Sequence, residues 1–205
     1  MNATVFIVDD DAMMLAATAQ YLESKDLRTR CYRSGSTFLK DHDPSIPGCM
    51  LLDLAMPDMN GLAVQQELMR RDQNRPIVFL SGCAEILETV EAMKAGAVDF
   101  LTKPFDEKNL LSVIRLAIER DAHLRVLQGR KREIQERFAL LSSREREVLN
   151  SVVAGMQNKQ IAHQLHIGEK TVKVHRARVV SKLGIRAVAD LVRFVQELSR
   201  HPSDG

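Results

Sequence analysis

The sequence predicts a doubly wound α/β domain with a parallel sheet, followed by a small all-α domain. Two observations indicate this order. Short apolar runs alternate with segments of helical spacing up to residue 120, where the alternation stops. The charge changes at the same place: residues 1–120 contain 13 Lys and Arg against 18 Asp and Glu, and residues 121–205 contain 16 against 9. An acidic half attracts cations and a basic half attracts polyanions, so the halves are expected to have different partners.

Three apolar runs have the length of buried parallel strands, and two weaker runs complete a set of five. In chain order the runs are Val5–Val8, Leu27–Tyr32, Cys49–Leu52, Ile77–Leu80 and Val98–Leu101, of which the second and fifth are the weaker. Each run is followed by apolar residues at helical spacing. These groups are Met14-Leu15-Ala19-Leu22, Phe38-Leu39, Leu62-Val64-Leu68, Ile86-Val90-Met93 and Leu110-Ile114-Ala117. A domain of this kind binds ligands outside the carboxyl ends of its strands.

Polar side chains follow four of the five predicted strands at that edge. Asp9 and Asp10 follow the first strand, Asp53 the third, Ser81 the fourth and Lys103 the fifth. Three carboxylates at one point repel one another unless a cation compensates them. Oxygen ligands without histidine or thiolate suit Mg²⁺, and one carboxylate could then accept a phosphoryl group whose oxygens contact the lysine and the hydroxyl. A single Asp at a strand end is more often a helix cap, so the prediction depends on the whole constellation.

These residues stand in motifs that resemble the receiver domain of bacterial two-component response regulators. The motifs are Val-Asp-Asp-Asp, Leu-Asp-Leu-Ala-Met-Pro, Ser-Gly and Leu-Thr-Lys-Pro-Phe, in that order along residues 1–120. The resemblance implies a five-stranded sheet of flavodoxin-like order 2-1-3-4-5, with Asp53 as the phosphoacceptor. It also implies that Asp10 and Asp53 ligate Mg²⁺ directly, Asp9 through water, and Ala55 through its backbone carbonyl.

The same resemblance assigns a switch pair, Ser81 and Phe100. The hydroxyl would move toward the phosphoryl group, and the aromatic ring would turn inward into the vacated space. Phe100 read alone could equally be an ordinary core residue. Asp11 is as suited to capping the following helix as to influencing the metal, because acidic residues favour helix N-termini.

Residues 121–141 are interpreted as a charged helical linker interrupted by Gly129. Positions 124, 127, 131, 134, 138 and 141 follow 3-4 spacing and are apolar except for Lys131. Two interpretations remain open, a short coiled-coil seam between subunits or packing against the protein's own domains.

Residues 142–200 are predicted to form a helix-turn-helix domain, with a flexible tail at 201–205. Ser142 and Glu145 form a capping box that opens a helix ending near Gly155. A second, shorter helix follows Asn158, and a third runs over Glu169–Leu183 with Gly168 before it and Gly184 after it. In such a motif the last helix enters the major groove of DNA.

At 100° per residue, Val172, Val179 and Leu183 share the face of the third helix that must pack inward. The residues left for DNA are Lys173 and Val174 at base edges, and Lys170, Thr171, Arg176 and Arg178 at phosphates. Lys182 is expected to be merely solvated.

The motifs Leu-Ser-Ser-Arg-Glu-Arg-Glu-Val-Leu, Asn-Lys-Gln-Ile-Ala and Thr-Val-Lys-Val-His-Arg resemble the LuxR-type helix-turn-helix. With the receiver, the chain resembles the NarL/FixJ branch of response regulators. Gln157 and Gly168 replace the small hydroxyl residues usual at their positions, and Ala177 replaces a lysine found in some members.

The resulting hypothesis is a transcription factor that a sensor histidine kinase phosphorylates at Asp53, so that receivers dimerise and bind double-stranded promoter DNA. By resemblance, the dimerising face includes the helix from about Glu85 to Lys94, the Phe100 strand and the helix near Asp106. RNA polymerase is a further candidate partner. Only self-directed phosphotransfer and slow self-dephosphorylation are expected as chemistry.

Two other functional classes fit the sequence less well. A Mg²⁺-dependent phosphatase would need a second general acid and a lid, which the sequence does not offer. A regulator that works by protein contact without phosphate is disfavoured by the intact triad. No apolar stretch approaches the ~20 residues that span a bilayer, so no membrane contact and a cytoplasmic location are expected. Three cysteines without C-x-x-C spacing predict neither a disulfide framework nor a zinc site.

Overall fold

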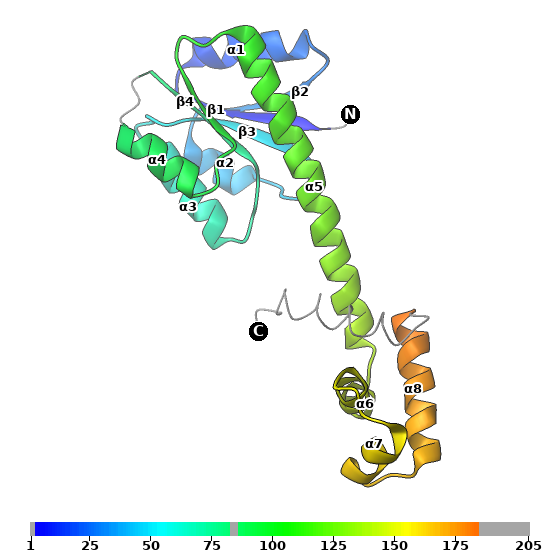
Figure 1. The fold of residues 1–205 in the computed structure, drawn as a ribbon. Helices are drawn as coiled ribbons and strands as arrows, with labels where there is room; N and C mark the ends of the chain where they lie inside the picture. The colour runs from blue at the N-terminus through cyan, green and yellow to red at the C-terminus, as the bar shows by residue number, and fades with distance from the viewer. Residues whose placement is uncertain (1–2, 83–85, 185–205) are drawn as a thin grey trace. The chain divides into compact units, whose positions relative to one another are not determined.

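A computed structural model describes residues 3–82 and 86–184 of the chain (Figure 1). The chain divides into two compact units, Met1–Arg125 and Val126–Gly205. The predicted tail, residues 185–200 of the predicted DNA-binding domain, and Glu85 at the start of one predicted helix lie outside the described residues. No helix of the described residues is long and apolar enough to cross a membrane.

The first unit is a five-stranded parallel sheet with helices on both faces (Figure 1). The strands lie in the order β2-β1-β3-β4-β5, which confirms the predicted order 2-1-3-4-5. The elements in chain order are β1 (Thr4–Val8), α1 (Ala12–Glu23), β2 (Arg28–Tyr32), α2 (Gly35–Asp41), β3 (Gly48–Asp53), α3 (Gly61–Arg70), β4 (Ile77–Ser81), α4 (Ile86–Lys94), β5 (Asp99–Thr102) and α5 (Glu107–Ala139).

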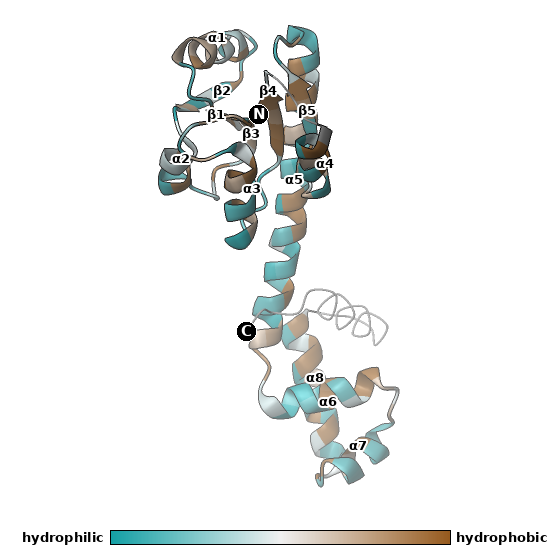
Figure 2. Cartoon of the chain, turned by 90° about the vertical axis from the view of Figure 1, so that its left-hand side faces the viewer, coloured by the Kyte–Doolittle hydropathy of each residue, from teal (hydrophilic) through white to brown (hydrophobic). Residues whose placement is uncertain are grey.

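The sheet separates two apolar layers, because alternate residues of each strand point to opposite faces. One layer joins Val5, Ile7 and Leu51 of the strands to α1 and α5. The other joins strand residues such as Phe6 and Phe79 to α2, α3 and α4. The central strands β1, β3 and β4 are therefore buried on both faces, as the brown colour of β4 in Figure 2 illustrates, whereas the edge strand β2 is largely exposed. This burial explains why the central strands read as continuous apolar runs in the sequence.

The boundary predicted between receiver and linker, at residues 120 and 121, lies within one continuous helix. α5 runs without interruption from Glu107 to Ala139, and Gly129 lies inside it. A glycine within a helix costs only about 1 kcal/mol relative to alanine, so good helix formers on either side carry the helix through it. Space around Gly129 is open, with no atom within 4 Å of the position of an added Cβ.

The second unit contains the three predicted short helices. They are α6 (Ser143–Val153), α7 (Asn158–Gln164) and α8 (Glu169–Leu183). The predicted capping box is present: the Ser142 hydroxyl accepts from the Glu145 N–H, and Glu145 Oε2 accepts from the Ser142 N–H at 2.8 Å. Gly184 ends α8 in the left-handed conformation at φ 66°, where glycine carries no steric penalty.

The C-terminal part of the predicted linker contributes to the apolar core of the second unit. Ile134 and Phe138 of α5 and Leu141 pack with residues of α6, α7 and α8 in one apolar cluster. Arg137 also donates from Nη1 to the Leu183 carbonyl at 3.0 Å. This part of the linker therefore packs against the protein's own helices, whereas Leu127 is half exposed.

Candidate functional site

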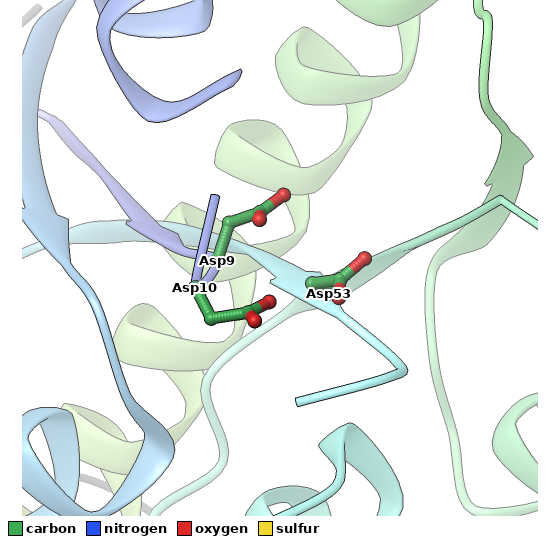
Figure 3. Close-up of side chains that lie close together, drawn as sticks. All are labelled: Asp9, Asp10 and Asp53. Carbon is green, nitrogen blue, oxygen red and sulfur yellow. The ribbon is translucent and has the colours of Figure 1, made fainter. Parts of the chain in front are cut away.

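The acidic residues meet at the carboxyl edge of the sheet, where Asp9 and Asp10 follow β1 and Asp53 ends β3 (Figure 3). Register in the parallel pair β1·β3 places Val8 beside Leu52, so the residues that follow are also neighbours. One carboxylate oxygen from each of the three residues lies within 4.8 Å of the others. Asp9 and Asp53 are buried, and Asp10 is half-buried.

Lys103 compensates two of these carboxylates. Its Nζ donates to Asp9 Oδ2 at 2.6 Å and to Asp53 Oδ1 at 2.7 Å. The lysine reaches this position because its backbone N–H continues the β4·β5 pairing and donates to the Ser81 carbonyl at 2.7 Å. The edge of the sheet thus holds one cation between two buried anions, with a third anion beside them.

Burial and the neighbouring charges shift the pKa values of Asp53 and Lys103. Burial raises the pKa of Asp53, and the nearby Asp9 and Asp10 add to this effect against the opposing influence of Lys103. Burial lowers the pKa of Lys103, but its hydrogen bonds to Asp53 and Asp9 outweigh burial and the net shift is upward. One ammonium group faces three carboxylates, so this cluster is short of positive charge.

The donor set fits a small divalent cation. Mg²⁺ binds oxygen at about 2.0–2.1 Å, so two oxygens on one ion lie at most about 4.2 Å apart. One carboxylate oxygen from each of the three residues lies within 4.8 Å of the other two, so the cluster is compact enough for its members to share one ion directly or through water. Only oxygen ligands are present among the three residues, which suits Mg²⁺ better than softer metals.

Asp11 and Arg33 support the triad through backbone groups. The Asp11 side chain caps α1 by accepting from the Met13 and Met14 N–H groups, while its own N–H donates to Asp9 Oδ1 at 2.9 Å. Helix capping, the first of its two predicted roles, is therefore confirmed. Arg33 donates from Nη2 to the Asp10 carbonyl at 3.2 Å, a contact that nothing in the sequence pattern indicated.

The remaining predicted residues of the first unit lie around the triad. Ser81 is buried at the end of β4. Phe100, half-buried on β5, is paired in register with Phe79 and stacked on its ring at 6.3 Å between centroids. Ala55 is exposed two residues after Asp53.

In the second unit, α8 presents the two predicted faces. Val172, Val179 and Leu183 are buried in the apolar cluster. Five of the six residues predicted to contact DNA are exposed, namely Lys170, Thr171, Lys173, Val174 and Arg178.

Two basic residues of α8 have partners that the sequence did not reveal. Arg176 is half-buried and donates from Nη1 to Asn158 Oδ1 at 2.7 Å, which ties α8 to the start of α7. The expectation that Lys182 is merely solvated was wrong. Its Nζ donates to the buried Glu145 at 2.6 Å and to the Leu140 carbonyl at 3.0 Å, because the capping box turns this carboxylate toward α8.

Comparison with protein families finds two matches along the chain. Residues 5–115 match the model of the response regulator receiver domain. Residues 139–195 match that of the bacterial regulatory proteins of the luxR family. The second match begins at the last residue of α5 and includes all of α6, α7 and α8.

Relatives and solved structures cover nearly the whole chain. The response regulator protein TodT of Pseudomonas putida F1 is 42% identical over 96% of this chain and 86% of its own length. The transcriptional regulatory protein FixJ of Azorhizobium caulinodans is 36% identical over 98% and 95%. The solved structure of response regulator StyR has a TM-score of 0.86 at 38% identity and covers 96% of this chain and 100% of that one. Full-length FixJ from B. japonicum has a TM-score of 0.58 at 30% identity, covering 98% of both.

Proposed function

This chain belongs to the response regulators that join a receiver domain to a luxR-family DNA-binding domain, and we propose that phosphorylation of Asp53 is what controls it. It is a two-component transcriptional regulator. The proposal rests chiefly on one observation: Lys103 Nζ bridges Asp9 and the phosphoacceptor candidate Asp53 at 2.6 and 2.7 Å, with Asp10 in the same cluster. A partner histidine kinase supplies the phosphoryl group.

In the proposed reaction an Asp53 carboxylate oxygen bonds to phosphorus while the bond from phosphorus to the kinase histidine breaks. Asp53 and Asp10 would hold Mg²⁺ directly, Asp9 would hold it through water, and Ala55 would contribute its backbone carbonyl. The bound ion supplies positive charge for the phosphoryl oxygens. Lys103 transfers its hydrogen bond from Asp53 to a phosphoryl oxygen, and Ser81 offers a second donor. The chemistry is limited to this self-directed transfer and slow self-dephosphorylation.

The switch follows from the change of charge at Asp53. Ser81 moves toward the phosphoryl group, and the half-buried Phe100 turns inward. The face around α4, β5 and the start of α5 then pairs with a second receiver. Leu87 and Val90 of α4 and Leu116 of α5 are exposed apolar residues on these elements, which favours burial in a dimer.

A dimer brings two copies of α8 to DNA. Lys173 and Val174 contact base edges in the major groove, and the half-sites lie about 34–36 Å or a multiple apart. Lys170, Thr171 and Arg178 contact phosphates. Arg176, bonded to Asn158 through Nη1, retains its other guanidinium nitrogens for a phosphate.

DNA binding tests the complete proposal. Gel shifts with a natural promoter should show tighter binding after treatment with acetyl phosphate and Mg²⁺, and Asp53→Asn should abolish that increase. Lys173→Ala should cost about 1–3 kcal/mol and relax sequence discrimination, because a base-edge contact is lost. The matched control is Arg132→Ala, which removes an exposed charge of α5 in the same unit. Equal binding by wild type and Lys173→Ala would show that α8 is not the reading helix.

A further inference from the structure

Phe79 lies beneath both residues of the proposed switch pair. It is fully buried in β4, and Ser81 follows two residues later, so both side chains point to the same face of the sheet. Across the strand pair, Phe79 is in register with Phe100, and the two rings stack with an interplanar angle of 27°. The ring of Phe79 therefore borders the space on this face through which Phe100 would turn inward.

Gly61, the first residue of α3, fixes the position of that ring. A Cβ at Gly61 would lie 2.9 Å from Phe79 Cε1, 2.6 Å from the Asp53 carbonyl oxygen and 3.2 Å from Leu54 Cα. The Gly61 N–H donates to the Leu54 carbonyl at 2.9 Å. The start of α3 thus touches the phosphoacceptor's own backbone on one side and the Phe79 ring on the other, and only a glycine fits between them.

We propose that Phe79 and Gly61 are positioning residues of the switch: the volume of the ring at 79, held in place by the bare backbone at 61, sets how readily Phe100 turns inward. The inference rests on the proposed function, since it concerns the switch that phosphorylation of Asp53 would operate. Cores are close-packed, so a side chain can turn inward only into space that its neighbours leave. Stacking also holds the two rings together in the present position.

A smaller side chain at 79 should therefore favour the inward position of Phe100 in two ways, by opening space and by removing the stacking partner. Phe79→Leu should strengthen dimerisation of the unphosphorylated protein by about fivefold, which is the lower end of coupling between sites in switching proteins. It should also speed phosphorylation, because a larger fraction of the molecules then already has the switch in the position that accompanies phosphorylation. Gly61→Ala should act in the opposite direction, by pressing the ring and the Asp53 backbone.

The matched control is Phe6→Leu. Phe6 is also fully buried and lies on the same sheet face, but it is in β1 and stacks edge-on against Phe38. It loses the same atoms from the same apolar layer. Phe6→Leu should lower stability as Phe79→Leu does and leave both dimerisation and phosphorylation rate unchanged.

A spectroscopic signal follows the ring directly. The chain has no tryptophan, so Phe100→Trp introduces one tryptophan at the switch position, which can be excited selectively over the two tyrosines. Its emission should shift toward shorter wavelength on phosphorylation as the ring leaves water, and Phe79→Leu in this background should produce part of the shift without phosphate.

The experiment compares wild type, Phe79→Leu, Gly61→Ala and Phe6→Leu by intact mass during treatment with acetyl phosphate and Mg²⁺, and by sedimentation for the dimerisation constant. Faster phosphorylation and tighter dimers in Phe79→Leu alone support the inference. Equal effects in Phe79→Leu and Phe6→Leu, or none in either, overturn it while the proposed function stands. A wild-type protein that gains no phosphate overturns the proposed function and this inference together. If Gly61→Ala does not fold, the comparison of the two phenylalanine variants still decides.

Discussion

Lys103 is the cation between two buried carboxylates, so its removal should destabilise the first unit in a way that Mg²⁺ reverses. Asp9 is 1% exposed and Asp53 5%, and both accept hydrogen bonds from Lys103 Nζ. Removing one partner of a buried ion pair costs about 3–5 kcal/mol, because the other charge stays buried without compensation. Lys103→Met should therefore lower the free energy of unfolding by roughly this amount at neutral pH without Mg²⁺. With a denaturant slope of about 2 kcal/mol/M, the urea midpoint falls by roughly 1.5–2.5 M.

Added Mg²⁺ should reduce the difference in the free energy of unfolding between the wild type and Lys103→Met. At one hundred times its dissociation constant a bound ion adds about 2.7 kcal/mol to the wild type. It should add more to Lys103→Met, where no ammonium group already offsets the carboxylates. Lower pH should also reduce this difference in the free energy of unfolding. Burial raises the pKa of Asp53, so this carboxylate takes up a proton and no longer needs the lysine to compensate its charge.

Tyrosine fluorescence during urea unfolding reports the stability of the first unit, in which Lys103 lies. Both tyrosines of the chain, Tyr21 and Tyr32, lie in the first unit, and the chain has no tryptophan. Lys108→Met is the control, because it removes an exposed lysine from the start of α5. The reasoning is refuted if Lys103→Met unfolds at the same urea concentration as Lys108→Met, or if Mg²⁺ leaves the gap between them unchanged.

Three further predictions concern the rest of the molecule. Burial lowers the pKa of His42 from 6.5 to about 4, so the folded state resists protonation of this side chain. The free energy of unfolding should therefore fall as the pH drops from 6.5 to 4. In urea unfolding curves measured at several pH values, His42→Leu should make this fall smaller. Lys182→Met should cost the second unit about 1.5–3 kcal/mol, because buried Glu145 loses its charged partner and keeps only the bond from the Ser142 N–H. Loss of helical circular dichroism on heating measures this cost, and a loss of stability no greater than that of an exposed-lysine control contradicts the prediction. Gly48→Ala should destabilise the protein by more than about 1 kcal/mol, since φ is +141° and the Cβ would overlap a backbone oxygen. Gly129→Ala should stabilise it by about 0.5–1 kcal/mol, because the position is helical and the space around it is open. Shifts of the urea midpoint in the same direction for both variants would contradict this geometry.

The first unit could be predicted from its sequence because its central strands β1, β3 and β4 are buried on both faces. Such strands appear as unbroken apolar runs, so the run Ile77–Leu80 indicated β4, which spans Ile77–Ser81, without any knowledge of its neighbours. The carboxyl edge then placed Asp9, Asp53 and Lys103 together, as the structure does. Local rules were equally sufficient for the second unit, where the capping box at Ser142 and the glycine after α8 mark helix ends.

Contacts between segments far apart in the sequence could not be predicted from the sequence. Nothing local to Lys182 indicates that Glu145, 37 residues earlier, turns its carboxylate toward it. The approach of Gly61 to Phe79 likewise depends on how α3 meets the sheet. The sequence left open whether α5 continues through Gly129, because a glycine weakens a helix only slightly and tertiary packing on both sides of it decides the outcome.

Intact mass of the purified protein, treated with acetyl phosphate in the presence and absence of Mg²⁺, tests the central claim most directly. The account predicts a gain of one phosphoryl group that requires Mg²⁺, is absent in Asp53→Asn, and is accompanied by dimer formation. No gain in a folded protein with Mg²⁺ present would contradict it, and would leave regulation by direct protein contact as the better explanation of the chain.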